Sequence, residues 1–144
     1  MGEKAVKILH CSKDAKDTID KVDAAKFLGL DLKSCPRIDL FLFAFALGVE
    51  SGIETELAKP DTLVRGEYIN TKNEALLYAS YYADLEADKG AEALTEIGSV
   101  YGKAQKYANT GFKLIDGMLG KSEEVVRMEL LKELDGMYQK ITGE

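Results

Sequence analysis

Residues 37–52, "RIDLFLFAFALGVESG", decide the fold, because they hold ten almost unbroken apolar residues, Leu40–Val49, in a chain that is 31% charged. This run has no β-branched residue before Val49, which favours a helix over a strand. Pro36 suits the first position of a helix, and a glycine follows near the other end of the run. We therefore predict a helix over residues 37–48.

A helix that is apolar on every side has no face to offer to water, so neighbouring helices of the same chain or of its oligomer must enclose it. The fold class predicted from this stretch is all-α, a compact bundle of about five helices around the central helix 37–48. A buried strand is the alternative for the same residues. A membrane span is excluded for this run, because ten helical residues cover about 15 Å and the hydrocarbon core of a bilayer is about 30 Å thick.

The length of 144 residues predicts one domain, 1–144, with an N-terminal segment 1–35 and a core 36–141. A chain of this size buries roughly two-thirds of its unfolded surface and needs neither disulfides nor a metal to fold. The net charge of −6 disfavours broad electrostatic attachment to nucleic acid. Residues 1–7 are charged and no apolar segment follows, so we expect no signal peptide and a cytoplasmic location.

Four further segments are predicted to be helices: residues 13–30, a segment from about Lys72 after a cap at Asn70 or Thr71, residues 91–119, and a segment after the cap Ser122. The clearest seam, with spacings of three and four, consists of Leu94, Ile97, Tyr101, Ala104, Ala108, Gly111, Ile115 and Met118. Asn109 and Gly111 either allow close packing there or interrupt the helix. The buried side expected for the last helix consists of Val126, Leu130, Leu134, Met137 and Ile141.

Residues 50–71 break the helical pattern and are long for a connection within a compact domain. Such loops are functional or mobile, so we expect this one to form part of a contact surface. Leu63–Val64 and Tyr68–Ile69 are predicted to pair as a small β-hairpin within 60–70. Residues 4–11 are either a strand or the start of a helix.

No catalytic motif is found. The chain has one histidine, no G-x-S-x-G nucleophile turn and no glycine-rich phosphate loop. His10, Cys11 and Cys35 do not have the spacing of a zinc site, and we interpret the cysteines as small buried residues. We therefore expect no enzyme activity, no catalytic residue, no metal and no cofactor.

The candidate binding residues are Arg65, Glu67 and Tyr68, which lie together in the irregular segment. They could contact an anion or a partner, and the alternative is that Arg65 pairs with a nearby acid. Because the chain has no tryptophan, tyrosines are the candidate anchors of an interface, although helix packing explains most of them equally well.

Three stretches together resemble small uncharacterised prokaryotic proteins found with DNA-phosphorothioation (Dnd) systems: "DLFLFAFALGVESG" at 39–52, "NEALLYASYYADLEAD" at 73–88 and "YGKAQKYANTGFKLI" at 101–115. The matching positions are Phe41, Ala44, Ala46, Leu47, Gly48, Tyr107, Ala108, Asn109 and Gly111. The resemblance covers about residues 37–116 and leaves the first 36 outside. It implies a cytoplasmic accessory protein of a bacterium, an archaeon or a mobile element, and it carries over no catalytic residue.

Three functions follow as expectations. The first is a non-enzymatic helical protein that binds other proteins or forms a homo-oligomer, as an accessory factor of a defence or DNA-modification system. The second is a nucleic-acid-associated protein that uses Lys13, Lys16 and Lys26. The third is a small-ligand binder or enzyme that uses Arg65 and Glu67 around a cleft.

Overall fold

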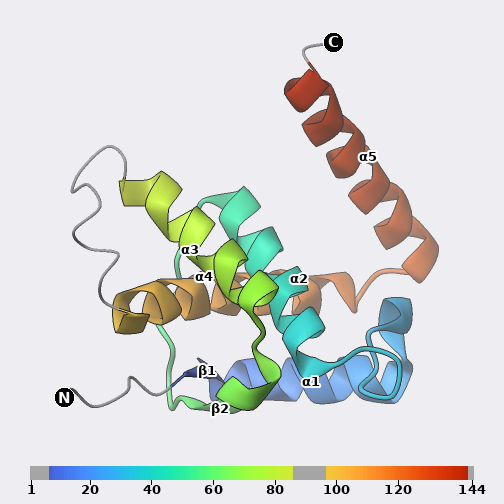
Figure 1. Ribbon diagram of the computed structural model, residues 1–144. Coiled ribbons are helices and arrows are strands. Elements are labelled where there is room, and N and C mark those ends of the chain that lie inside the picture. The colour runs from blue at the N-terminus through green and yellow to red at the C-terminus, as the bar shows by residue number, and fades with distance from the viewer. Residues whose placement is uncertain (1–6, 86–96, 143–144) are drawn as a thin grey trace, which may run out of the picture.

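Helices dominate the fold, which also holds one small sheet. The computed structural model describes residues 7–85 and 97–142. In chain order the elements are β1 (Ile8–Cys11), α1 (Lys13–Ala25), η1 (Phe27–Gly29), α2 (Arg37–Ser51), β2 (Asp61–Arg65), η2 (Gly66–Tyr68), α3 (Thr71–Leu85), α4 (Ile97–Met118) and α5 (Glu123–Thr142). The predicted helical fold with a small antiparallel sheet is confirmed for the described residues (Figure 1).

The centre of the fold is the crossing of α2 and α4. A Cβ atom at Gly48 of α2 would collide with the backbone carbonyl of Tyr107, and one at Gly111 of α4 would collide with that of Ala44. Because glycine has no Cβ atom, the two backbones touch at both places. Asn109 and Gly111 therefore do not interrupt α4, which runs unbroken through this crossing.

The helix α2 is central, but its neighbours cover one side more fully than the other. Phe41 and Ala44 are completely buried on the side that faces α4 and the sheet. On the opposite side Leu42 is half-buried, Ala46 is exposed and Val49 is 38% exposed. The described elements of the chain therefore do not enclose this helix at the stripe formed by Leu42, Ala46 and Val49, where enclosure by an oligomer stays a prediction.

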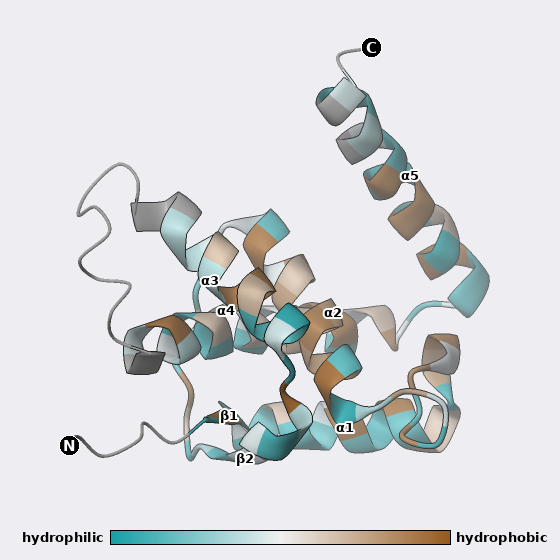
Figure 2. Ribbon diagram, in the orientation of Figure 1, coloured by the Kyte–Doolittle hydropathy of each residue, from teal (hydrophilic) through white to brown (hydrophobic). Residues whose placement is uncertain are grey.

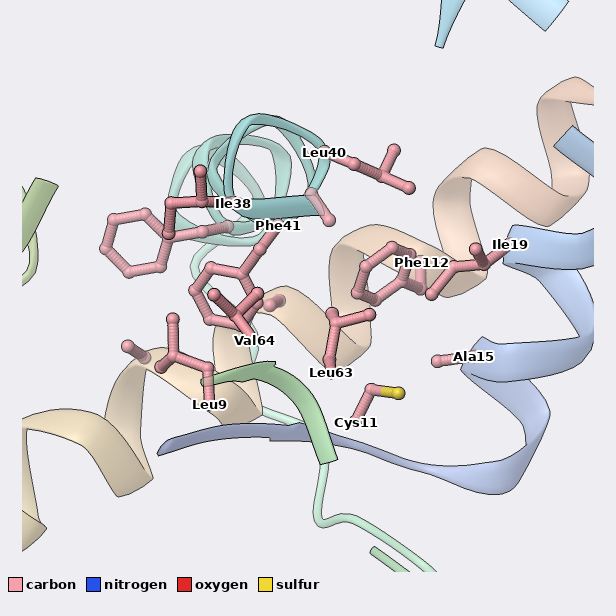
Figure 3. Close-up of a cluster of buried hydrophobic side chains, with 14 of the residues drawn as sticks. Leu9, Cys11, Ala15, Ile19, Ile38, Leu40, Phe41, Leu63, Val64 and Phe112 are labelled. Carbon is pink, nitrogen blue, oxygen red and sulfur yellow. The ribbon is translucent and has the colours of Figure 1, made fainter. Parts of the chain in front are cut away.

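Strand β2 pairs antiparallel with β1, which lies near the N-terminus. The expected hairpin between 63–64 and 68–69 is therefore wrong in its partner, and residues 66–68 form the 3₁₀ turn η2. For residues 4–11, where the sequence left a strand or a helix start open, residues 4–6 lie outside the described part of the structure and residues 8–11 form a strand. Leu9 and Cys11 of β1 are buried in the same core that Phe41 enters from α2 (Figure 3). Tyr68, by contrast, is exposed. The burial of Leu9 and Cys11 therefore favours β1 over residues 68–69 as the strand that pairs with β2.

Two helix ends differ from those expected. The first helix ends at Ala25 instead of near residue 30, because Lys26 and Leu28 adopt left-handed φ angles of 51° and 54°. The central helix continues beyond residue 48 and ends at Ser51, and Gly52 caps it with a φ angle of +74°, which glycine accepts best. Gly48 therefore does not end the helix, and its role is to allow the close packing against Tyr107.

The start of the long connection between α2 and β2 is tied to α4. The Thr55 N–H donates to the carbonyl of Lys106 at 3.1 Å, and the hydroxyls of Thr55 and Thr110 lie 2.7 Å apart. The side-chain amide of Asn109 donates to the carbonyls of Thr55 and Glu56 at 3.2 and 2.9 Å. These hydrogen bonds give partners to the backbone groups of Thr55 and Glu56, which lie outside regular secondary structure.

The predicted caps and seam of the later helices are confirmed. The side chain of Asn70 accepts from the N–H of Asn73 at 2.8 Å, and that of Ser122 accepts from the N–H of Val125 at 3.3 Å. The buried members of the predicted α4 seam are Tyr101, Ala104, Ala108, Gly111 and Ile115. Leu94 lies outside the described residues.

Helix α5 leaves the body of the protein after its first turns (Figure 1). Val126 is completely buried and Leu130 is half-buried, as expected, but Leu134 is 58% exposed. The predicted buried side is therefore wrong at Leu134, because no described element packs along this part of the helix. The side chains of Met137 and Ile141 lie outside the described part of the structure.

Candidate functional site

The protruding part of α5 carries large apolar side chains on its surface. Leu131, Leu134 and Tyr138 are 59%, 58% and 63% exposed. Their spacings of three and four residues place them on one face, next to Leu130. Figure 2 shows apolar residues along the middle of this helix. Since monomeric proteins rarely expose large contiguous apolar patches, this stripe is a candidate contact surface.

Two opposite charges border the apolar stripe of α5. Glu133 and Lys140 are seven residues apart, so they lie on the same side of the helix. Both are exposed, and within residues 7–85 and 97–142 neither has an ion-pair partner. By contrast, Lys121 and Glu129 near the base of the helix pair with each other at 3.2 Å. The charges beside the exposed stripe are therefore available to a partner.

A groove of about 640 Å³ lies at the base of α5, between this helix and the ends of α2 and α4. Leu47, Leu114 and Met118 line it from the body, and Val126 and Leu130 line it from α5. The apolar surface of α5 thus continues into a hollow of the body.

The predicted binding residues lie around the end of β2. Arg65 is the last residue of β2, while Glu67 and Tyr68 belong to η2, and all three are exposed. Arg65 and Tyr68 line a pocket of about 580 Å³, but Glu67 does not. Among the described residues Arg65 has no carboxylate within ion-pair distance, so the structure does not show the alternative pairing with a nearby acid.

Arg37, which no pattern in the sequence marks as a binding residue, lines the same pocket from the first turn of α2. Ile38, Leu63 and Val64 form its floor and are buried. Figure 3 shows Phe41 pointing from α2 toward Val64, one of the β2 residues of this floor. The sequence gives no sign of this neighbourhood, because it depends on how β2 packs against α2.

The lysines expected to bind nucleic acid lie on or just after α1. Lys16 is 3.2 Å from the carboxylate of Asp61. Lys13 and Lys26 are exposed, and Asp14, Asp17, Asp20 and Asp23 alternate with the lysines along the same helix. A nucleic-acid contact through these lysines stays a prediction.

The tyrosines divide between core and surface. Tyr101 and Tyr107 are buried, and the Tyr101 hydroxyl donates to Glu74 at 2.7 Å. Burial and this carboxylate raise the pKa of Tyr101. Tyr68 and Tyr82 are exposed, so only some of the candidate anchors are available to a partner.

Both cysteines are buried, as predicted. Burial raises the pKa of the Cys11 thiol to about 11, although the nearby Lys16 opposes this shift. Across residues 7–85 and 97–142, the acidic, cysteine and histidine side chains form no group of three able to hold a metal ion. Over the same residues, no helix combines the length and apolar character needed to cross a membrane.

No protein family, no curated protein and no solved structure matches this chain.

Proposed function

We propose that this protein acts through protein–protein contact, and that α5 joins two copies of the chain. The observation that supports the proposal best is the exposed stripe of Leu131, Leu134 and Tyr138 on a helix that leaves the body. Apolar area is worth roughly 25 cal/mol per Å² when it is removed from water, so pairing of two such stripes is favourable. This role is non-enzymatic.

The sequence of α5 is self-complementary when two copies pack antiparallel. Heptad spacing places Leu130, Leu134, Met137 and Ile141 along one seam. In an antiparallel pair Leu134 faces residue 137 of the second copy, and Leu130 faces residue 141. Residues 137 and 141 enter this register from the sequence alone.

The same register pairs the groups that flank the seam. Glu133 lies beside Lys140 of the second copy, and twofold symmetry forms this ion pair twice. On the other side of the seam, Leu131 lies beside Tyr138 of the second copy. A parallel pair would instead set Glu133 beside Tyr138, with no charge to meet it. The charge pattern therefore favours the antiparallel pair.

Sedimentation equilibrium of the full chain tests the proposal. We expect a mass twice the 15.8 kDa of one chain. The double variant Leu131→Glu/Leu134→Glu should weaken association at least about hundredfold, because it places one charge in the apolar seam, at residue 134, and another directly beside the seam, at residue 131. The matched control Lys132→Glu changes the net charge by the same amount on the solvent side of α5 and should leave the dimer intact.

Two results would overturn the proposal. One is a monomer at every concentration measured. The other is a dimer that tolerates Leu131→Glu/Leu134→Glu, because association would then use another surface. Circular dichroism of each variant establishes that the helices still form, so a loss of association is not mistaken for unfolding.

A further inference from the structure

Two of the three arginines in the chain line one pocket, although they come from different elements. Arg37 belongs to the first turn of α2, and Arg65 ends β2. None of the described residues that line this pocket is acidic. In a chain of net charge −6, this is a local concentration of positive charge.

The arginines differ from many lysines in having no acidic partner. Ion pairs with carboxylates hold Lys7, Lys16, Lys21, Lys103, Lys106 and Lys121. Within the described residues neither Arg37 nor Arg65 has a carboxylate within ion-pair distance. Both guanidinium groups are therefore available to an anion from outside the chain.

The pocket has the size and walls of a small-molecule site. Its volume of about 580 Å³ lies within the usual range of about 300–1,000 Å³ for such sites. Ile38, Leu63 and Val64 are buried in the core, so the floor is apolar and held in place. Tyr68 lines the edge with an exposed ring and hydroxyl.

We infer that this pocket binds a small organic anion, whose carboxylate or phosphate group contacts Arg37 and Arg65 while its apolar part lies on the floor. A guanidinium group suits this task, because its planar donors match the oxygens of a carboxylate or a phosphate in pairs. The hydroxyl of Tyr68 supplies a further donor at the edge. The inference does not depend on self-association through α5.

Titrations followed by ¹H–¹⁵N NMR of the full chain test the inference with three probes: benzoate, phenyl phosphate and the neutral analogue benzamide. We expect at least one anion to cause saturable shifts at the backbone N–H groups of residues 37–38 and 62–68. The two anions distinguish a carboxylate ligand from a phosphate ligand. Benzamide should bind at least about tenfold more weakly, because it lacks the charge.

Three variants locate the site. Arg37→Gln and Arg65→Gln should each weaken anion binding roughly ten- to hundredfold, which is what a hydrogen bond to a charged group contributes. Arg127→Gln removes the third arginine, on α5, and should leave binding unchanged. The inference is overturned if neither anion causes saturable shifts, if benzamide binds as well as the anions, or if the pocket variants bind like the wild-type protein.

Discussion

Gly111 of α4 lies directly against the backbone carbonyl of Ala44 in α2, with no space between them for a side chain. The same relationship holds in reverse between Gly48 and Tyr107, one helical turn away along each helix. These two contacts set the distance between the helices that form the centre of the core. Helices α1 and α3 and strand β1 pack against α4, and strand β2 packs against α2, whereas most of α5 extends away from the crossing.

Gly111→Ala should lower the free energy of unfolding by about 2–3 kcal/mol, because the added methyl group forces the two backbones apart. Gly102→Ala in the same helix is the matched control, since its Cβ atom would meet nothing within 4 Å. There the better helix propensity of alanine should raise the free energy of unfolding by up to about 1 kcal/mol. Urea unfolding followed by circular dichroism measures both, and equal effects of the two variants would contradict the crossing described above.

Asn109→Leu should lower the free energy of unfolding by about 2–4 kcal/mol, because buried polar groups lose their partners. The side-chain N–H groups of Asn109 donate to the carbonyls of Thr55 and Glu56, and its side-chain oxygen accepts from the Ser12 hydroxyl at 2.8 Å. Amide hydrogen exchange should also become faster at Thr55, whose N–H bonds to α4.

Gln139→Leu on α5 is the control for the lower stability of Asn109→Leu. Because Gln139 is exposed, this substitution should change the free energy of unfolding by less than about 0.5 kcal/mol. Unchanged exchange at Thr55 in Asn109→Leu would show that Asn109 does not hold the segment that follows α2.

Stability should fall as the pH rises from 9 toward 10, in part through Cys11. Burial raises the pKa of its thiol from the ordinary 9.0 to about 11. In this range the unfolded chain loses the thiol proton while the folded chain keeps it, so the free energy of unfolding decreases, by at most about 1.4 kcal/mol per pH unit. Well below pH 9 the thiol is protonated in both states and the dependence disappears.

Comparison of the wild-type protein with Cys11→Ala isolates this contribution. The variant should be less stable at neutral pH, because it leaves a small cavity, but its stability should fall less steeply between pH 9 and 10. Parallel slopes from urea unfolding at several pH values would be inconsistent with a raised pKa at Cys11.

Features that depend on neighbouring residues were predictable from the sequence, and those that depend on distant residues were not. The apolar run in α2, the seam of α4 and the caps Asn70 and Ser122 follow from local spacing and local hydrogen bonds. The pairing of β1 with β2 does not, because it joins segments more than 40 residues apart. For the same reason Arg65 and Tyr68 were found as candidates, but their neighbour Arg37 was not.

The stripe on α5 shows a different limit. Its periodicity correctly identifies an apolar face but not what covers it. Leu134 was therefore expected inside the chain's own core, whereas the helix extends away from that core. The apolar face of an amphipathic helix can be covered equally well by other elements of the same chain or by a second chain.

Charge reversal within α5 tests the antiparallel pairing most directly. Sedimentation equilibrium should show that Glu133→Lys and Lys140→Glu each weaken self-association, because each places like charges opposite one another twice. An equimolar mixture of the two variants should recover the dimer, since every pair then has opposite charges. If each single variant associates as strongly as the wild-type protein, or if the mixture recovers nothing, the antiparallel pairing of α5 is wrong.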